Sequence, residues 1–228
     1  MNVLVIMHAD AEGPGTLGEF LAAHEASLRT VKLHRGGALP QDPGHFDAIV
    51  LMGGPMSVLD EKRHPWLCAE NIFLHQAIQA DVPVLGFCLG AQLIAKACGA
   101  RIRKAPMAEL GWKEVFLTGM GEGDRLFYGL PKTFTVLQWH EDTFDLPTGG
   151  VLLAEAIECP HQAFRVRNAY GLQFHVEVTH AMLAAWCEPV EQGRDILYKY
   201  DFHKGVFDRH AGIFYSNFLR LITNTHQQ

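Results

Sequence analysis

The stretch Val82-Pro83-Val84-Leu85-Gly86-Phe87-Cys88-Leu89-Gly90-Ala91-Gln92-Leu93-Ile94-Ala95 decides the fold of this chain. An apolar run rich in valine and leucine ends at Gly86, and from Leu89 onward the apolar residues recur at the spacing of a helix. The stretch therefore predicts a buried strand that turns sharply into a helix.

Cys88 stands at the centre of this turn, with one glycine two residues before it and another two residues after it. A Gly-x-nucleophile-x-Gly sequence is typical of the nucleophile elbow, a strained turn that lifts its central side chain out of a sheet. The start of the following helix would favour the thiolate form of Cys88, because unpaired N–H groups and the helix dipole stabilise negative charge there. The alternative is a structural cysteine at the end of a core strand, since free cysteines are among the most buried residues.

Apolar strands alternate with helical segments through the first hundred residues. Strands are predicted at 3–7, 29–34, 47–52 and 82–87, and helices at 17–21 and 64–80, the longer helix with Trp66, Ile72, Phe73 and Ile78 in the core. This order predicts an α/β protein with three layers around a doubly wound, mostly parallel central sheet. The working site of such a sheet lies beyond the carboxyl ends of its strands.

The second half of the chain has shorter β-like segments with turn signals between them. These segments predict antiparallel strands that extend the parallel sheet, at 113–117, 133–139, 151–156, 163–166 and 171–174. We expect a single domain over 1–228, with 180–228 as a C-terminal helical segment packed on it. The aromatic residues of that segment are expected to cover the core, and would also suit a homodimer interface: Phe202, Phe207, Phe214, Tyr215 and Phe218.

The composition is typical of a soluble globular protein, with 228 residues, 48% hydrophobic and 19% charged. A net charge of −6 without a run of one sign argues against binding to nucleic acid or to an anionic membrane. The five cysteines lack CxxC spacing, so the sequence predicts neither disulfides nor a metal site. With no apolar run near ~20 residues and no signal peptide, we expect a cytoplasmic protein.

A thiolate nucleophile needs a base, usually histidine, and a third group that orients it. Among thirteen histidines, His175 is the best candidate, because it follows the short apolar segment 171–174 and precedes Glu177 by two residues. In an extended segment the side chains of His175 and Glu177 project to the same side, which allows a hydrogen bond between them.

Acyl chemistry also needs hydrogen-bond donors for an oxyanion. The backbone N–H of Leu89 follows the nucleophile, and Gly53-Gly54, at the end of the strand expected beside it, would let backbone approach a substrate closely. Gln92 lies one helical turn after Cys88, so its amide would reach a substrate bound at the thiol.

Three segments resemble, in the same order, the signatures of the class I glutamine amidotransferases: Gly53-Gly54-Pro55, Gly86-Phe87-Cys88-Leu89-Gly90-Ala91-Gln92 and Gly171-Leu172-Gln173-Phe174-His175-Val176-Glu177. The similarity runs from about Asp47 to Val178. It implies the flavodoxin-like fold of that family, with Cys88 as nucleophile, His175 as base and acid and Glu177 as the orienting carboxylate.

The same resemblance implies a glutamine-binding pocket and no cofactor. Gly54 and Leu89 would donate to the oxyanion, and Gly53 and Gln92 would contact the substrate. Trp139-His140-Glu141-Asp142 is similar to the segment that holds the glutamine α-amino and carboxylate groups, which makes Trp139, Glu141 and Asp142 further substrate-binding candidates. Many relatives have a small residue at 139, glycine at 141 and proline at 176, where this chain has Trp139, Glu141 and Val176.

The implied reaction is hydrolysis of the γ-amide of glutamine or a related γ-glutamyl compound through a γ-glutamyl thioester on Cys88. No second catalytic domain fits in 228 residues, so the ammonia would pass to a separate synthetase partner. The alternatives are a stand-alone γ-glutamyl peptide hydrolase, a cysteine hydrolase related to intracellular protease I, and a regulatory subunit that kept the fold without turnover.

Overall fold

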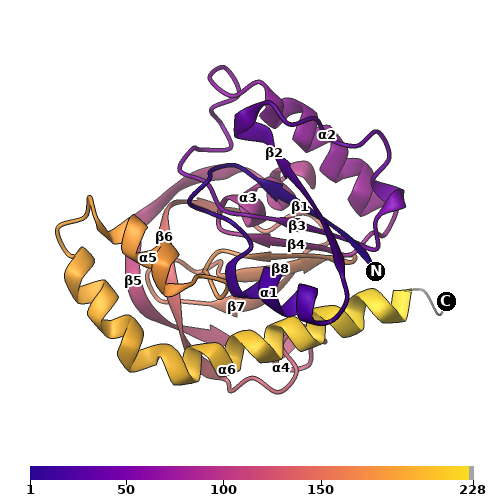
Figure 1. The fold of residues 1–228 in the computed structure, drawn as a ribbon. Helices are drawn as coiled ribbons and strands as arrows, with labels where there is room; N and C mark the ends of the chain where they lie inside the picture. The colour runs from indigo at the N-terminus through magenta and orange to yellow at the C-terminus, as the bar shows by residue number, and fades with distance from the viewer. Residues whose placement is uncertain (226–228) are drawn as a thin grey trace.

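The computed structural model describes residues 1–225, which form one nine-stranded sheet with helices on both faces (Figure 1). The strand order is β2-β1-β3-β4-β9-β8-β7-β5-β6. The strands are β1 (Asn2–Met7), β2 (Ser27–Lys32), β3 (Ala48–Leu51), β4 (Val84–Phe87), β5 (Ile102–Leu117), β6 (Thr133–Phe144), β7 (Val151–Glu155), β8 (Ala163–Val166) and β9 (Ala169–Leu172). The helices are α1 (Gly15–Ala23), α2 (Trp66–Gln79), α3 (Leu89–Ala97), α4 (Gly119–Glu122), α5 (His180–Cys187) and α6 (Gly193–Thr225), with short 3-10 turns at Leu33–Arg35 and Pro43–His45.

The parallel part of the sheet consists of β2, β1, β3, β4 and β9. Alternate residues of its strands enter two separate cores because successive side chains point to opposite faces. Val3 and Val5 pack in the core that α1 and α6 cover, whereas Leu4 and Ile6 pack in the core that α2 and α3 cover. The expectation of a three-layer, mostly parallel α/β fold is confirmed.

The antiparallel part begins at β9, which pairs parallel with β4 on one side and antiparallel with β8 on the other. The sheet continues through β7 and β5 to β6 at the edge. Strand β5 is 16 residues long, far longer than the predicted 113–117, and its pairing with β6 shifts register between Lys104 and Glu109. This irregularity hides the two-residue alternation that would have revealed the first half of β5.

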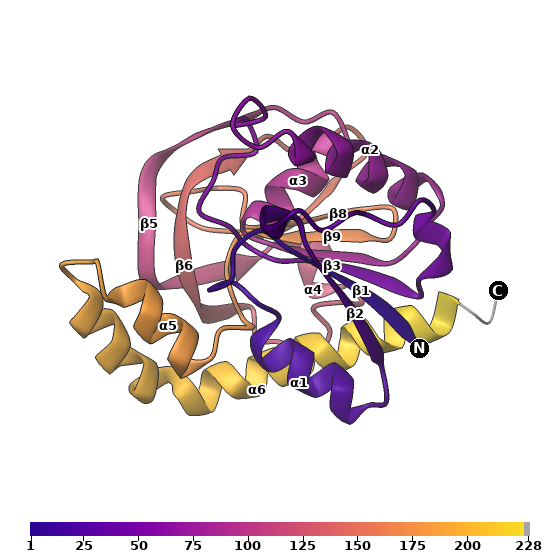
Figure 2. The ribbon, with the colours of Figure 1, turned by 45° about the horizontal axis from the view of Figure 1, so that its top comes forward.

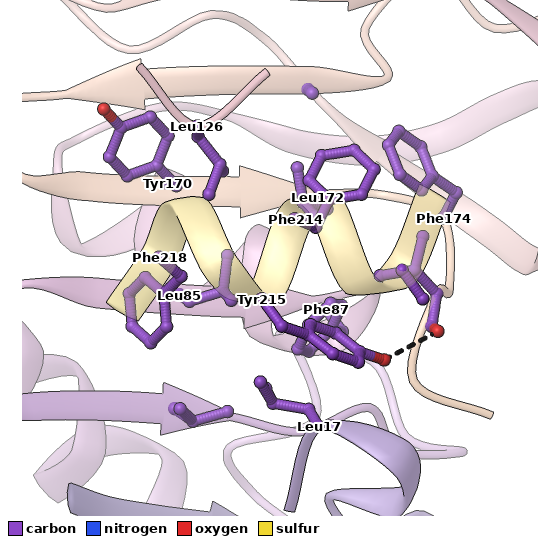
Figure 3. Packing of buried hydrophobic residues seen from close by; sticks show 14 of the residues in the cluster. Leu17, Leu85, Phe87, Leu126, Tyr170, Leu172, Phe174, Phe214, Tyr215 and Phe218 are labelled. Atoms are coloured by element: carbon purple, nitrogen blue, oxygen red, sulfur yellow. Dashed lines mark hydrogen bonds between the residues drawn. The ribbon is translucent and has the colours of Figure 1, made fainter. Parts of the chain in front are cut away.

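The C-terminal segment forms the two helices α5 and α6, so the expectation of a helical segment there is confirmed. Helix α5 and the first turns of α6 lie beside β5 and β6, and the rest of α6 runs beneath the parallel strands (Figure 2). Phe214 and Phe218 of α6 pack against Leu85 and Leu172 in the core (Figure 3). Phe207 and Tyr215 are also buried, but the expectation for Phe202 is wrong because its side chain is 82% exposed.

Two other predictions from apolar spacing need correction. Ile72 was expected in the core of α2 but is 60% exposed, whereas Phe73 and Ile78 are buried. The strand predicted at 171–174 ends at Leu172, because the following residues leave β9 to cross towards β6, where His175 pairs with Leu137 in an isolated bridge. Within 1–225, no helix combines the length and the apolar character needed to cross a membrane.

Candidate active site

Cys88 lies between β4 and α3 with φ 49° and ψ −106°, a strained conformation for a residue other than glycine. The glycines on either side of it are required by space. A Cβ at Gly86 would lie 2.5 Å from the carbonyl carbon of Gly90, and one at Gly90 would lie 2.4 Å from the carbonyl oxygen of Leu51. The local sequence thus produces the elbow, and the Cys88 thiol contacts the carbonyl oxygen of Trp139 at 3.6 Å.

His175 and Glu177 follow β9, next to the carboxyl end of β4. Nδ1 of His175 and Oε1 of Glu177 are 2.7 Å apart, and both side chains are buried. The other Glu177 oxygen accepts a hydrogen bond from the backbone N–H of Val176 at 2.9 Å. Burial alone would lower the pKa of His175, but the Glu177 carboxylate and a hydrogen bond with Cys88 outweigh it and raise that pKa well above its usual value. The arrangement can therefore hold a proton on the imidazole beside the thiol.

The loop that carries these residues is anchored from two elements. Tyr215 of α6 donates a hydrogen bond from its hydroxyl to the carbonyl oxygen of Val176 at 2.8 Å. The backbone N–H of Thr16, at the start of α1, donates to the carbonyl oxygen of Glu177 at 2.9 Å. Helices α1 and α6 lie in the same layer of the fold, so the packing of this layer fixes the position of the loop that carries His175.

The Gly53-Gly54 loop follows β3 and faces the nucleophile. A Cβ at Gly54 would lie 2.6 Å from the Leu89 side chain and 2.9 Å from the His8 Cβ, so only glycine fits there. Leu89 is the first residue of α3, where a backbone N–H has no carbonyl partner within the helix. The two predicted oxyanion donors thus come from adjacent elements on either side of Cys88.

His8, directly after β1, supports this loop from behind. Its Nδ1 lies 2.9 Å from the carbonyl oxygen of Met52 and 3.1 Å from that of Gly53, and its Nε2 lies 2.9 Å from Oε1 of Glu70 on α2. Both side chains are fully buried. Burial lowers the pKa of His8, but the Glu70 carboxylate and the two carbonyl acceptors outweigh it, so the net pKa is raised.

A cavity of about 410 Å³ opens above the thiol and brings most of the predicted site residues together. Its lining includes Cys88, Gly54, Gln92, Trp139, Glu141 and Asp142 together with Glu12, Pro55, Met56, Ser57, Asp60, Lys104, Leu110 and His140. Gly53 lies beneath this lining, where an added Cβ would meet Glu12 and His175. The size suits a small amino-acid derivative better than a macromolecule.

Asp142 is held in the cavity wall by contacts to both its backbone and its side chain. Its carbonyl oxygen accepts from Gln92 Nε2 at 3.1 Å and from Nδ1 of His140 at 3.0 Å. Its carboxylate accepts from the Ser57 hydroxyl at 2.7 Å and pairs with Lys104 at 3.0 Å. The Gln92 amide nitrogen donates to the Asp142 carbonyl oxygen and, at 3.3 Å, to Oε1 of Gln173. Both of its N–H groups are therefore used within the protein, which leaves its carbonyl oxygen for a ligand.

A buried polar network lies behind the strand that carries Asp142. Nε2 of His140 is 2.9 Å from a Glu109 oxygen, which also accepts from Gln162 at 2.8 Å. Glu109, His140 and Cys159 offer ligand atoms within 4.8 Å of one another, as a metal site would. In this structure the three residues take part in hydrogen bonds, between His140 and Glu109, from Gln162 to Glu109 and between Cys159 and the Thr143 hydroxyl.

Several of these residues were not predicted from the sequence. His8 and Glu12 both follow the first strand, and the rule that sites lie beyond the carboxyl ends of parallel strands was available to find them. Glu70 and Glu109 had no such signal, because a polar residue inside a helix or a long strand usually faces water. Lys104 and Ser57 belong to an irregular strand and a loop.

Comparison with known proteins shows which family has this fold and these motifs. The model of the family described as glutamine amidotransferase class-I matches residues 23–184. The glutamine amidotransferase-like protein YfeJ of Salmonella typhimurium is 32% identical over 78% of this chain and 77% of its own length. The chain belongs to the class I glutamine amidotransferase family.

Longer enzymes and solved structures are similar as well. The glutamine-hydrolysing GMP synthase of Bacillus pumilus is 34% identical over 76% of this chain, which spans only 30% of that enzyme. A glutamine amidotransferase from Thermotoga maritima superposes with a TM-score of 0.88 at 27% identity and covers 97% of this chain and 98% of its own. One from Methylobacillus flagellatus also gives 0.88, at 28% identity, covering 96% and 94%.

Proposed function

We propose that this protein hydrolyses the γ-amide of glutamine or of a related γ-glutamyl compound. The observation that carries the proposal is that Cys88, on a strained elbow, lines a small cavity and hydrogen-bonds with His175 of the buried His175–Glu177 pair. Membership of the amidotransferase family supports the same reaction.

The proposed reaction has two halves. The Cys88 thiolate attacks the amide carbon, and the N–H groups of Gly54 and Leu89 stabilise the oxyanion. The His175 imidazolium gives its proton to the departing nitrogen, the carbon–nitrogen bond breaks, and a γ-glutamyl thioester remains. Water then attacks the thioester while His175 takes its proton, which releases glutamate and restores the thiolate.

The substrate's amino-acid end is proposed to lie against Asp142 and Gln92. In this proposal the carbonyl oxygen of Gln92 and the backbone of 139–142 would contact the α-amino and α-carboxylate groups. The Glu141 side chain is exposed and paired with Lys104 at 3.2 Å, so its contribution to binding would come through its backbone. Gly53 contributes by leaving room for the Glu12 carboxylate next to His175.

The fate of the ammonia is part of the proposal. Because the chain resembles 30% of a GMP synthase, we propose that a separate synthetase subunit in the cytoplasm accepts it. The alternatives of a stand-alone γ-glutamyl peptide hydrolase and of a non-catalytic subunit make different predictions for the isolated chain.

Ammonia and glutamate release from glutamine, beside amine release from γ-glutamyl peptides, tests the proposal. Wild type should release product at least ~10³-fold faster than Cys88→Ala, since the nucleophile cannot be replaced. Cys68→Ala, which removes an exposed cysteine, should behave as wild type. Equal background release by wild type and Cys88→Ala from every substrate, with slow and equal alkylation of all cysteines by iodoacetamide, would leave the regulatory subunit as the surviving explanation.

A further inference from the structure

Glu12 is a carboxylate of the candidate active site that the triad chemistry leaves without a role. It lies in the loop between β1 and α1 and lines the same cavity as Cys88. A methyl group added at Gly53 would lie 2.1 Å from a Glu12 carboxylate oxygen and 3.2 Å from Cε1 of His175. The carboxylate therefore sits over Gly53, next to the edge of the catalytic imidazole.

The carboxylate of Glu12 has no hydrogen-bond donor among residues 1–225. Burial, with the neighbouring Glu177 carboxylate, raises its pKa, and the positive charges of His175 and His8 oppose that rise. By contrast, the carboxylate of Asp142 on the opposite wall is already satisfied by Ser57 and Lys104. A half-buried carboxylate without a donor calls for a ligand that supplies an N–H group or a positive charge.

The position of His175 tells which part of a substrate would meet Glu12. This step depends on the proposed function, in which the amino-acid end of the γ-glutamyl group lies towards Gln92 and Asp142. The departing nitrogen must then lie beside His175, because it takes its proton there. Glu12 adjoins His175, so it faces the departing amine rather than the γ-glutamyl group.

Two aromatic rings lie in or next to the same cavity. Trp139 lines the cavity, and its ring centre is 5.7 Å from that of Trp186, which in turn lies 5.0 Å from the His175 ring. Trp186 also donates from Nε1 to the carbonyl oxygen of Ala11 at 3.0 Å, which fixes the backbone immediately before Glu12. A carboxylate beside an aromatic ring is the combination that proteins use to recognise amines and ammonium groups.

We propose that Glu12 and Trp139 form a leaving-group subsite that favours γ-glutamyl amides of ammonia or of cationic amines and disfavours γ-glutamyl peptides. A departing amino acid carries a carboxylate, which would be repelled by Glu12, whereas ammonia or an amine donates N–H groups to it. The bonds that form and break are those of the proposed thioester reaction, and Glu12 only accepts hydrogen bonds from the nitrogen that leaves.

Three substrates of similar size test the subsite: γ-glutamyl-ethylenediamine (cationic), γ-glutamyl-ethylamide (neutral) and γ-glutamylglycine (anionic). In wild type, kcat/KM for the cationic substrate should exceed that for the anionic one by ~10-fold or more, and Glu12→Gln should reduce this ratio to within ~3-fold of unity. Glu19→Gln, which removes an exposed carboxylate from α1, is the matched control and should keep the wild-type ratio. An unchanged ratio in Glu12→Gln would overturn the subsite.

A second measurement tests Glu12 without turnover. Cationic 2-aminoethyl and anionic 2-sulfonatoethyl methanethiosulfonate both modify thiols, and mass spectrometry of the peptide that contains Cys88 gives the two rates. The ratio of cationic to anionic rates should fall ~5-fold or more in Glu12→Gln, and equal ratios in wild type and variant would contradict the proposal. If wild type cleaves no γ-glutamyl substrate but the ratio of modification rates falls in Glu12→Gln, the proposed hydrolysis is wrong. The preference of Glu12 for cationic groups near Cys88 is then still supported.

Discussion

Two buried histidine–glutamate pairs lie on opposite sides of the Gly53-Gly54 loop, and they are built almost alike. His175 and Glu177 are 2.7 Å apart, and His8 and Glu70 are 2.9 Å apart. In both, a carboxylate engages one ring nitrogen and raises the imidazole pKa against the effect of burial. The difference lies at the remaining nitrogen, which serves the Cys88 thiol in one pair and backbone carbonyl oxygens in the other.

This difference shows how one chemical unit serves two purposes. An imidazole beside a thiol can exchange a proton with a substrate, whereas an imidazole that donates to carbonyl oxygens can only hold backbone in place. In a trans peptide the C=O and the following N–H point in opposite directions. Because His8 binds the carbonyl oxygen of Gly53, the N–H of Gly54 points away from His8, and Gly54 itself lines the cavity.

A third histidine–glutamate pair, His140 and Glu109, lies behind the part of the cavity lining that contains Asp142. His140 donates from Nδ1 to the carbonyl oxygen of Asp142 and meets Glu109 through Nε2. It resembles the His8 pair in acting on backbone, but Asp142 has other partners in Gln92, Ser57 and Lys104. Losing this pair should therefore disturb the site less than losing either of the other two.

The largest effect is expected from the pair that faces the nucleophile. Glu177→Gln keeps the size of the side chain but removes the charge that stabilises the imidazolium, so kcat/KM for the best γ-glutamyl substrate should fall ~10²–10⁴-fold. Alkylation of Cys88 by iodoacetamide near neutral pH should slow as well. A loss below ~10-fold would show that His175 needs no anionic partner.

The His8 pair should come second, with a loss confined to the chemical step. His8→Ala/Glu70→Gln, in which the carboxylate is neutralised to avoid a buried charge, should lower kcat ~10²-fold with KM within ~3-fold, as for loss of one oxyanion donor. His8→Asn/Glu70→Gln restores a donor near the position of Nδ1 and should recover most of kcat. Steady-state kinetics with the same substrate measure both variants.

Cys88 alkylation separates this positioning role from general damage to the fold. Alkylation forms no oxyanion, so its rate should be the same in wild type and in both double variants.

The pKa of His8 is higher in the folded protein than in the unfolded chain. The stabilisation that protonated His8 contributes is therefore complete at a pH below its unfolded pKa and is lost as the pH rises through its folded pKa. The gap in unfolding free energy between wild type and His8→Asn/Glu70→Gln should accordingly narrow with rising pH, and a gap that widens would contradict the ion pair.

The smallest effect is expected at the third pair. Glu109→Gln should raise KM ~3–10-fold and change kcat less than ~3-fold, because His140 loses its anionic partner while Gln92 still holds the Asp142 carbonyl. Glu141→Gln, at an exposed carboxylate next to His140 on β6, is the comparison variant and should change KM less. A kcat loss as large as that of the His8 variants would place Glu109 in the chemical step.

Local patterns were enough to predict strands β1 to β4 of the parallel part and the three motif segments, whereas β9, expected as an antiparallel strand, pairs parallel with β4. Apolar runs at β1, β3 and β4 are continuous because both faces of these strands are buried, and that signal depends on neighbours in sequence. The first half of β5 and the exposed side chains of Ile72 and Phe202 were predicted wrongly, because register and helix orientation depend on what packs against them.

The sequence by itself determined the family, the elbow around Cys88 and the candidates His175 and Glu177, since glycine spacing and short motifs express local geometry. Only the tertiary structure decided that His8 and Glu70, 62 positions apart, meet behind the Gly53-Gly54 loop and that Glu12 lies next to the His175 imidazole. Such contacts join the ends of different strands and helices. Their partners are chosen by sheet order and layer packing, which no single stretch of sequence records.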